Sequence, residues 1–162
     1  MFGTVESERP LKPYERLRKH WIETDAGVET GSHTESEIRA LEARYGIRLP
    51  DDFREYVMHS CPRAECGWDN TLTDWWNLSR IRSIREEFNS WPSIENPIIL
   101  ANIDDHLFFA DYSLWCWAWA INCGNGEHRG RIAVISGGSD PFVADSFGEF
   151  VDRFVQDPRL LL

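Results

Sequence analysis

Basic residues are scarce in this chain of 162 residues, which carries 17 Lys and Arg against 27 Asp and Glu and has a net charge of −10. A protein that binds nucleic acid directly needs a basic surface for the phosphates, so this charge argues against such binding. The shortage is most marked between Arg85 and Arg129, where no Lys or Arg occurs but seven acidic residues do. Two explanations remain open: an acidic surface for a basic protein partner, or buried strands that omit bases.

Long apolar runs and paired cysteines are also lacking. No stretch approaches the roughly 20 apolar residues that span a bilayer, and residues 1–13 contain no run typical of a signal peptide. We therefore expect a cytoplasmic protein without membrane contact. The four cysteines, Cys61, Cys66, Cys116 and Cys123, form no C-x-x-C pair. We expect free thiols rather than disulfides or zinc, and we expect no metal and no cofactor.

Signatures of known catalytic sites are missing as well. The sequence contains no Gly-x-Ser-x-Gly elbow, Walker loop, His-Glu-x-x-His motif or dinucleotide-binding fingerprint. The Gly-rich segment 137–141 has no following Lys, which favours a turn over a phosphate loop. Ser136, His128 and Asp111 could be combined into a Ser-His-Asp catalytic set. Any chain of this composition contains such triples, so the combination does not indicate an enzyme. An enzyme is the least favoured function.

Aromatic residues are abundant, with eight Trp, and the apolar residues are densest from residue 98 to 136. Short apolar runs lie at residues 98–101, 107–110, 114–121 and 132–135. Each is bounded by turn residues, a pattern typical of antiparallel strands. In the third run a period of two places Trp115, Trp117 and Trp119 on one face and small residues on the other. We expect the C-terminal helix to pack on the small-residue face.

Helix signals surround this sheet region. Capping boxes begin at Thr34 and at Ser146, and Gly46 has the position of a helix C-cap. We expect further helices with the following bounds: 13–23, 51–59 and 80–88. A short strand is expected over residues 75–78, with Ser79 as a possible N-cap of the helix that follows.

Four motifs occur in a characteristic order. The first runs from Ile38 to Tyr56 and includes the Leu49-Pro50-x-x-Phe53 link. The others are Trp76-x-Leu78-x-x-Ile81, Phe109-Ala110-Asp111 and Ala144-Asp145-Ser146-Phe147-x-x-Phe150. In this order the motifs resemble the SUKH superfamily, typified by the yeast Smi/Knr cell-wall regulator, and the resemblance covers about residues 34–154.

The resemblance implies a single α+β domain, with a mixed, largely antiparallel sheet of about five or six strands, helices packed on it and a C-terminal helix. We assign residues 1–33 to an N-terminal arm and an extra helix, 34–157 to the SUKH-like domain and 158–162 to a tail. Bacterial members of the superfamily are mostly inferred to be immunity proteins that neutralise toxins, many of them nucleases. The resemblance therefore implies a non-catalytic protein-binding domain. A toxin-neutralising immunity protein is the leading hypothesis, and a regulatory or scaffold module is the alternative.

The partner-binding surface is expected to combine acids with exposed tryptophans, because an acidic binder associates faster with the basic surface of a nuclease and interface hot spots favour Trp. The candidate residues are Asp104, Asp105, Asp111, Glu127, Trp68, Trp75 and Trp115. Alternative roles remain open for several of them. Asp111 ends a strand and can cap the following turn, and Trp115, like Trp117 and Trp119, can pack in the core. Asp104, Asp105 and His106 form a solvated turn more readily than a metal site, because three adjacent residues rarely converge on one ion.

Overall fold

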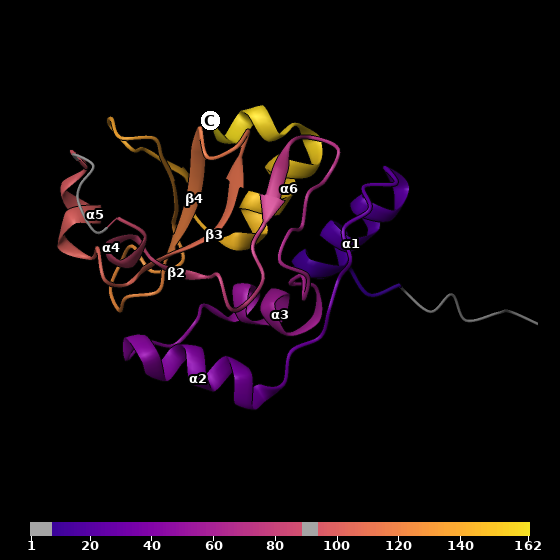
Figure 1. Ribbon diagram of the computed structural model, residues 1–162, viewed down its shortest axis with the longest axis horizontal. Coiled ribbons are helices and arrows are strands. Elements are labelled where there is room, and N and C mark those ends of the chain that lie inside the picture. Colours follow the sequence, from indigo (N-terminus) through magenta and orange to yellow (C-terminus); the bar gives the residue numbers. More distant parts are fainter. Residues whose placement is uncertain (1–7, 89–93) are drawn as a thin grey trace, which may run out of the picture.

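The computed structural model describes residues 8–88 and 94–162, in which helices lie against both faces of one sheet (Figure 1). The helices are α1 (Pro13–Glu23), α2 (Glu35–Tyr45), α3 (Asp51–His59), α4 (Ile84–Glu87), α5 (Pro97–Ala101), α6 (Phe147–Gln156) and the 3-10 helix η1 (Pro158–Leu161). The strands are β1 (Thr73–Trp75), β2 (Arg82–Ser83), β3 (His106–Tyr112), β4 (Trp117–Asn122), β5 (Ile132–Ile135) and β6 (Phe142–Ala144). Residues 1–7 of the expected N-terminal arm lie outside the described residues.

The sheet has the strand order β1-β3-β4-β5-β6, with β2 pairing with β3 beyond the end of β1. Every pairing among the described strands is antiparallel. The long hairpin of β3 and β4 forms the centre, and its register shifts between Phe108 and Ala110. The predicted α+β fold, with five or six strands and a C-terminal helix, is confirmed.

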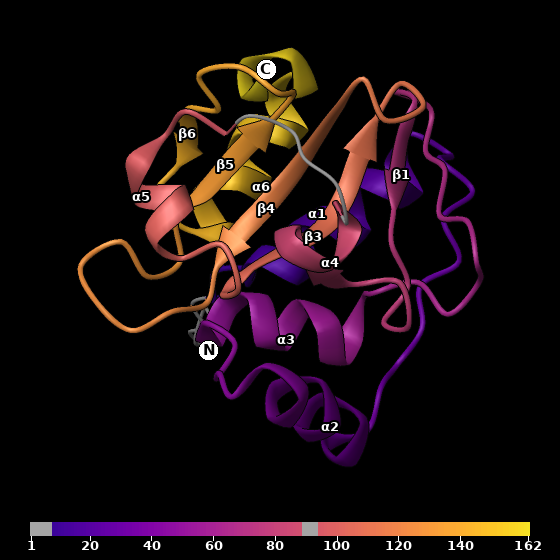
Figure 2. The same cartoon turned by 60° about the vertical axis from the view of Figure 1, so that its left-hand side comes forward.

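Helices α6 and α1 cover one face of the sheet, whereas α4 and α5 lie on the other (Figure 2). Trp119 of β4 is completely buried against Phe150 of α6, with ring centroids 5.4 Å apart. The C-terminal helix therefore packs on the tryptophan face, and its expected placement on the small-residue face was wrong. The physical reason lies in β3, where Phe108 pairs with Ala120 and fills the small-residue face from the neighbouring strand.

Local capping signals set the start of α1 and both ends of α2, as predicted. The Thr34 hydroxyl accepts a hydrogen bond from the Glu37 amide at 3.2 Å, and the Glu37 carboxylate accepts one from the Thr34 amide at 2.7 Å. Gly46 ends α2 in the left-handed conformation with φ of 64°. Pro13 begins α1. At this position an N–H would have no partner within the helix, so the missing N–H of proline costs no hydrogen bond.

The segment from 80 to 101 departs from expectation. The predicted strand at 98–101 is helix α5, because the Asn96 side chain accepts hydrogen bonds from the amides of Ile98 and Ile99 and Pro97 occupies the first turn. Helix α4 begins at Ile84 rather than near residue 80, because the preceding two residues pair with β3 as strand β2. Its N-cap is Ser83.

The start of β4 and the end of the chain also differ from expectation. Strand β4 begins at Trp117, because Ser113, Leu114 and Trp115 adopt left-handed conformations that form a turn. The predicted C-terminal tail contains η1, in which Leu161 is completely buried and its carbonyl accepts a hydrogen bond from the Trp119 indole at 2.9 Å. None of the described helices combines the length and the apolar character that crossing a bilayer requires.

Candidate functional site

The seven candidate residues lie at or beside the two ends of the β3–β4 hairpin: Asp104, Asp105 and Glu127 at one end, and Asp111, Trp115, Trp75 and Trp68 at or near the other. Asp111 occupies the buried end of β3, where the register pairs it with Asp74 of β1. The two carboxylates are 2% and 4% exposed. Burying two like charges side by side is unfavourable unless a cation lies between them. The sheet thus requires a basic residue at this point.

Arg80 supplies that cation. Its guanidinium nitrogens lie 2.7 Å from Asp74 Oδ2 and 3.3 Å from Asp111 Oδ2, and its plane lies over the ring of Trp76 at 4.1 Å. We call Asp74, Arg80 and Asp111 the charged cluster. Asp111 also accepts hydrogen bonds from the Trp76 indole at 2.8 Å and from the Trp115 amide at 2.9 Å. Asp111 therefore caps the turn after its strand, the alternative role considered above.

Trp75 is completely buried and does not serve as an exposed anchor. Its ring contacts Trp21, Tyr56 and Phe154, which come from three helices on the α6 side of the sheet. The burial of Trp75 has a simple cause. Adjacent residues of a strand point to opposite faces of the sheet, and both faces are covered at β1, so that all three of its residues are buried. Trp68 is half-buried and forms an isolated bridge with Asp74 beside β1.

Asp104 and Asp105 lie at the start of β3 and Glu127 lies in the β4–β5 loop, and we call these three residues the acidic end. The Cys123 amide donates to the Asp105 carbonyl at 2.9 Å, which ties the two segments together. Asp104 and Glu127 are exposed, whereas Asp105 is half-exposed. Asp104 pairs with Arg85 of α4. The segment between Arg85 and Arg129, which contains no Lys or Arg, therefore still has a basic side chain paired with one of its acids in the folded protein.

Trp115 lies at the opposite end of the hairpin. Ser113 follows Asp105 by eight residues, so this end is roughly 26 Å from the acidic end at about 3.3 Å per residue. Trp115 follows Leu114, which is 82% exposed. We call Ser113, Leu114 and Trp115 the hairpin tip. Leu72, which is 58% exposed, lies beside it and accepts a hydrogen bond from the Ser113 amide at 2.9 Å.

Leu114 was missed as a candidate because the sequence placed it inside a strand. Its side chain is the most exposed large apolar group of the described residues. No glycine, asparagine or aspartate marks the tip, so the residue types give no signal for positive φ. The exposed leucine became visible only from the backbone conformation.

Charge pairing over the described residues leaves the acids in excess. All Lys and Arg side chains there, except those of Arg18 and Arg129, lie within 4.0 Å of an acidic side chain. Arg129 instead donates to the Cys123 carbonyl at 2.7 Å. Several acids have no cationic partner among the described residues, and Asp105, Glu29 and Glu65 are three of them. The charge that remains for a partner is therefore mainly negative.

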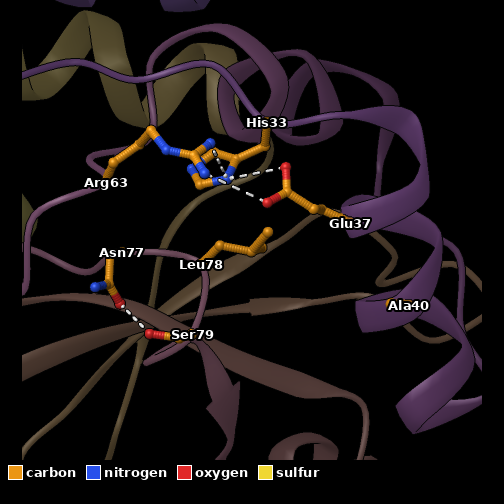
Figure 3. Close-up of a pocket in the computed structure, with 7 residues that line it drawn as sticks. All are labelled: His33, Glu37, Ala40, Arg63, Asn77, Leu78 and Ser79. Atoms are coloured by element: carbon orange, nitrogen blue, oxygen red, sulfur yellow. Dashed lines mark hydrogen bonds and ion pairs between the residues drawn. The ribbon is translucent and has the colours of Figure 1, made fainter.

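A pocket of about 340 Å³ lies between the start of α2 and the turn after β1 (Figure 3). Its lining is formed by His33, Glu37, Ala40, Arg63, Asn77, Leu78 and Ser79. Arg63 pairs with Glu37 at 3.5 Å and donates to the Ser32 carbonyl, and the Ser79 hydroxyl donates to Asn77 Oδ1 at 2.9 Å. These polar groups bond mainly to one another. We assign no function to this pocket.

Two buried histidines predict that the protein loses stability in mildly acidic solution. Burial lowers the pKa of His33 and of His106, and Arg63 lowers that of His33 further. Below the ordinary value of 6.5 the unfolded chain binds more protons than the folded protein, so stability falls as the pH drops from about 7 towards 5. We expect a lower melting temperature at pH 5.5 than at 7.5. The double variant His33→Gln/His106→Gln should show a smaller difference, and an unchanged difference would contradict this assignment.

The cysteines are all free thiols, and Cys61 and Cys123 are buried. Burial raises the pKa of both thiols, which keeps them protonated and unreactive. Within residues 8–88 and 94–162 no three His, Cys, Asp or Glu side chains are grouped as metal ligands would be.

Comparison with known proteins identifies the family. The model of the SMI1 / KNR4 family (SUKH-1) matches residues 33–153, from the residue before the α2 capping box to the middle of α6. No curated protein matches the sequence. The match covers well over half of the chain and includes all the motifs that resembled the SUKH superfamily. The chain belongs to the SMI1 / KNR4 family (SUKH-1).

Proposed function

We propose that the protein is a cytoplasmic immunity protein, which neutralises a toxin domain by binding it and without catalysing a reaction. The observation that carries this proposal is the charge pairing: almost every base of the described residues already has an acidic partner, so the charge left over is negative. Membership of the SUKH-1 family supports the same function, because bacterial relatives of this superfamily are mostly inferred to be immunity proteins.

A nuclease toxin suits such a surface. Its active face must attract phosphate and therefore carries Lys and Arg. An acidic protein is drawn to that face over distances of about a Debye length, roughly 10 Å at 0.1 M salt, and then blocks access of the nucleic acid. The acidic end of the hairpin is the part of the proposed interface that would meet the basic face.

The association rate tests this placement. The double variant Asp104→Lys/Asp105→Lys should slow association with the toxin domain at least about tenfold at low salt, because electrostatic steering contributes on that scale. The proposal predicts that a reading frame beside that of this protein encodes a toxin, and the C-terminal domain of that frame's product is the probe. Stopped-flow fluorescence gives the association rate. The difference from wild type should shrink as salt is added.

A matched control is available in Glu29→Lys/Glu65→Lys, which changes the net charge by the same amount. Both residues are exposed and lie in the loops before α2 and after α3, away from the start of β3. We expect this control to associate at a rate closer to that of wild type. Equal rates for both double variants would exclude the acidic end as the steering surface.

A further inference from the structure

We propose that the hairpin tip is an apolar anchor, whose Leu114 side chain inserts into an apolar pocket on the toxin domain. This inference rests on the proposed function and adds a second contact to it. Three observations support it: the conformation of the tip, the contacts that hold it, and the groups it exposes.

The backbone conformation of the hairpin tip is energetically unfavourable. Ser113, Leu114 and Trp115 have φ values of 52°, 55° and 67°, and none is glycine. A left-handed conformation brings the Cβ atom too close to the following carbonyl oxygen, and runs of such residues are rare. Strain of this kind persists only where the surrounding structure imposes it, and it is concentrated at functional sites.

The surrounding structure does impose it. The Ser113 amide donates to the Leu72 carbonyl at 2.9 Å, the Trp115 amide to Asp111 Oδ1 at 2.9 Å, and the Cys116 amide to the Tyr112 carbonyl at 3.1 Å. The Trp115 ring packs edge-on against Phe108, with centroids 5.3 Å apart. Tertiary contacts thus fix the tip on both sides of Leu114 and leave that side chain facing solvent.

These contacts also decide what the tip can bind. Successive amides of a left-handed turn form a site for anions, but here the chain's own Asp111 carboxylate takes up the Trp115 amide. The tip therefore offers an external partner chiefly the apolar side chains of Leu114 and Leu72 and the half-buried ring of Trp115. A net charge of −10 opposes approach to an anionic membrane. A protein with an apolar pocket is the partner that fits.

The geometry agrees with a single interface. A standard interface buries about 800 Å² on each partner, a patch roughly 30 Å across. The acidic end and the hairpin tip belong to one hairpin and are roughly 26 Å apart. One toxin domain can therefore cover both. In such an arrangement the acids govern association, whereas the buried apolar anchor governs dissociation.

The variant Leu114→Asn tests the anchor. Asn tolerates the left-handed conformation, so the melting temperature should stay the same or rise by at most about 4 °C. Dissociation from the neighbouring-frame toxin domain, measured by surface plasmon resonance, should become about 10- to 30-fold faster. Ile22→Asn is the control, because Ile22 is 77% exposed on α1 and lies outside the hairpin. It should dissociate like wild type.

The possible outcomes of this experiment distinguish the anchor from the proposed function and from a purely structural role of Leu114. Wild-type dissociation of Leu114→Asn would overturn the anchor and leave the proposed function standing. A failure of the wild-type protein to bind the toxin domain would overturn the proposed function, and the anchor with it. A clear fall in melting temperature would mean that Leu114 serves folding. Binding of wild type, but not of Leu114→Asn, to phosphatidylglycerol vesicles would replace the protein pocket by a lipid surface.

Discussion

Replacing Arg80 with methionine is expected to lower the free energy of unfolding by about 3–5 kcal/mol, the usual cost of removing one partner from a buried ion pair. The substitution leaves the carboxylates of Asp74 and Asp111 buried side by side without their cation. Trp76 also loses the guanidinium that lies over its ring. Denaturant titration measures the change.

The same substitution at Arg85 is the matched control for this prediction. Arg85 pairs with Asp104, but both side chains are largely exposed, at 62% and 67%. Exposed ion pairs contribute between zero and about 1 kcal/mol, so Arg85→Met should change stability by no more than that. If Arg80→Met were as mild as Arg85→Met, the charged cluster would not be the buried support that we describe.

Truncation of Phe150 to alanine is expected to cost about 3–5 kcal/mol of unfolding free energy, because it leaves a cavity in a well-packed core. Phe150 is completely buried and joins α6 to the sheet. Its ring lies 5.2 Å from that of Phe109 and 5.4 Å from that of Trp119. The loss therefore affects helix and both central strands together, and denaturant titration measures it.

Val155→Ala on the same helix provides the comparison. Val155 is 36% exposed, so its truncation removes little buried surface and should cost less than about 1 kcal/mol. A similarly small loss for Phe150→Ala would mean that α6 does not hold the sheet as the structure indicates.

The helix boundaries that sequence predicted correctly are those set by local hydrogen bonds. Thr34 and Gly46 act within one turn of α2, and Pro13 needs no tertiary contact to begin α1. The same kind of signal was present at Asn96 and Pro97. That signal competes with the Ile-Ile-Leu run that follows, whose composition favours a strand.

Features that depend on tertiary structure were not predictable in this way. The sequence does not reveal that Trp75 is enclosed by three helices, or that Arg80 lies between two carboxylates from neighbouring strands. The left-handed tip is held by distant Leu72 and by Asp111, while its own residues prefer other conformations. For the candidate site, the sequence suggested the acids at the start of β3 as part of a partner-binding surface, which stays a prediction, whereas the exposure of Leu114 became visible only from the fold.

The central claim is that this protein acts by covering a toxin. The most direct measurement is a titration of the purified neighbouring-frame toxin domain with this protein, while the activity of the toxin is followed. We predict that activity falls in proportion to the amount added and vanishes at one molecule per toxin molecule. Full toxin activity in the presence of a large excess would contradict the claim. So would inactivation by substoichiometric amounts, which would indicate a catalytic protein.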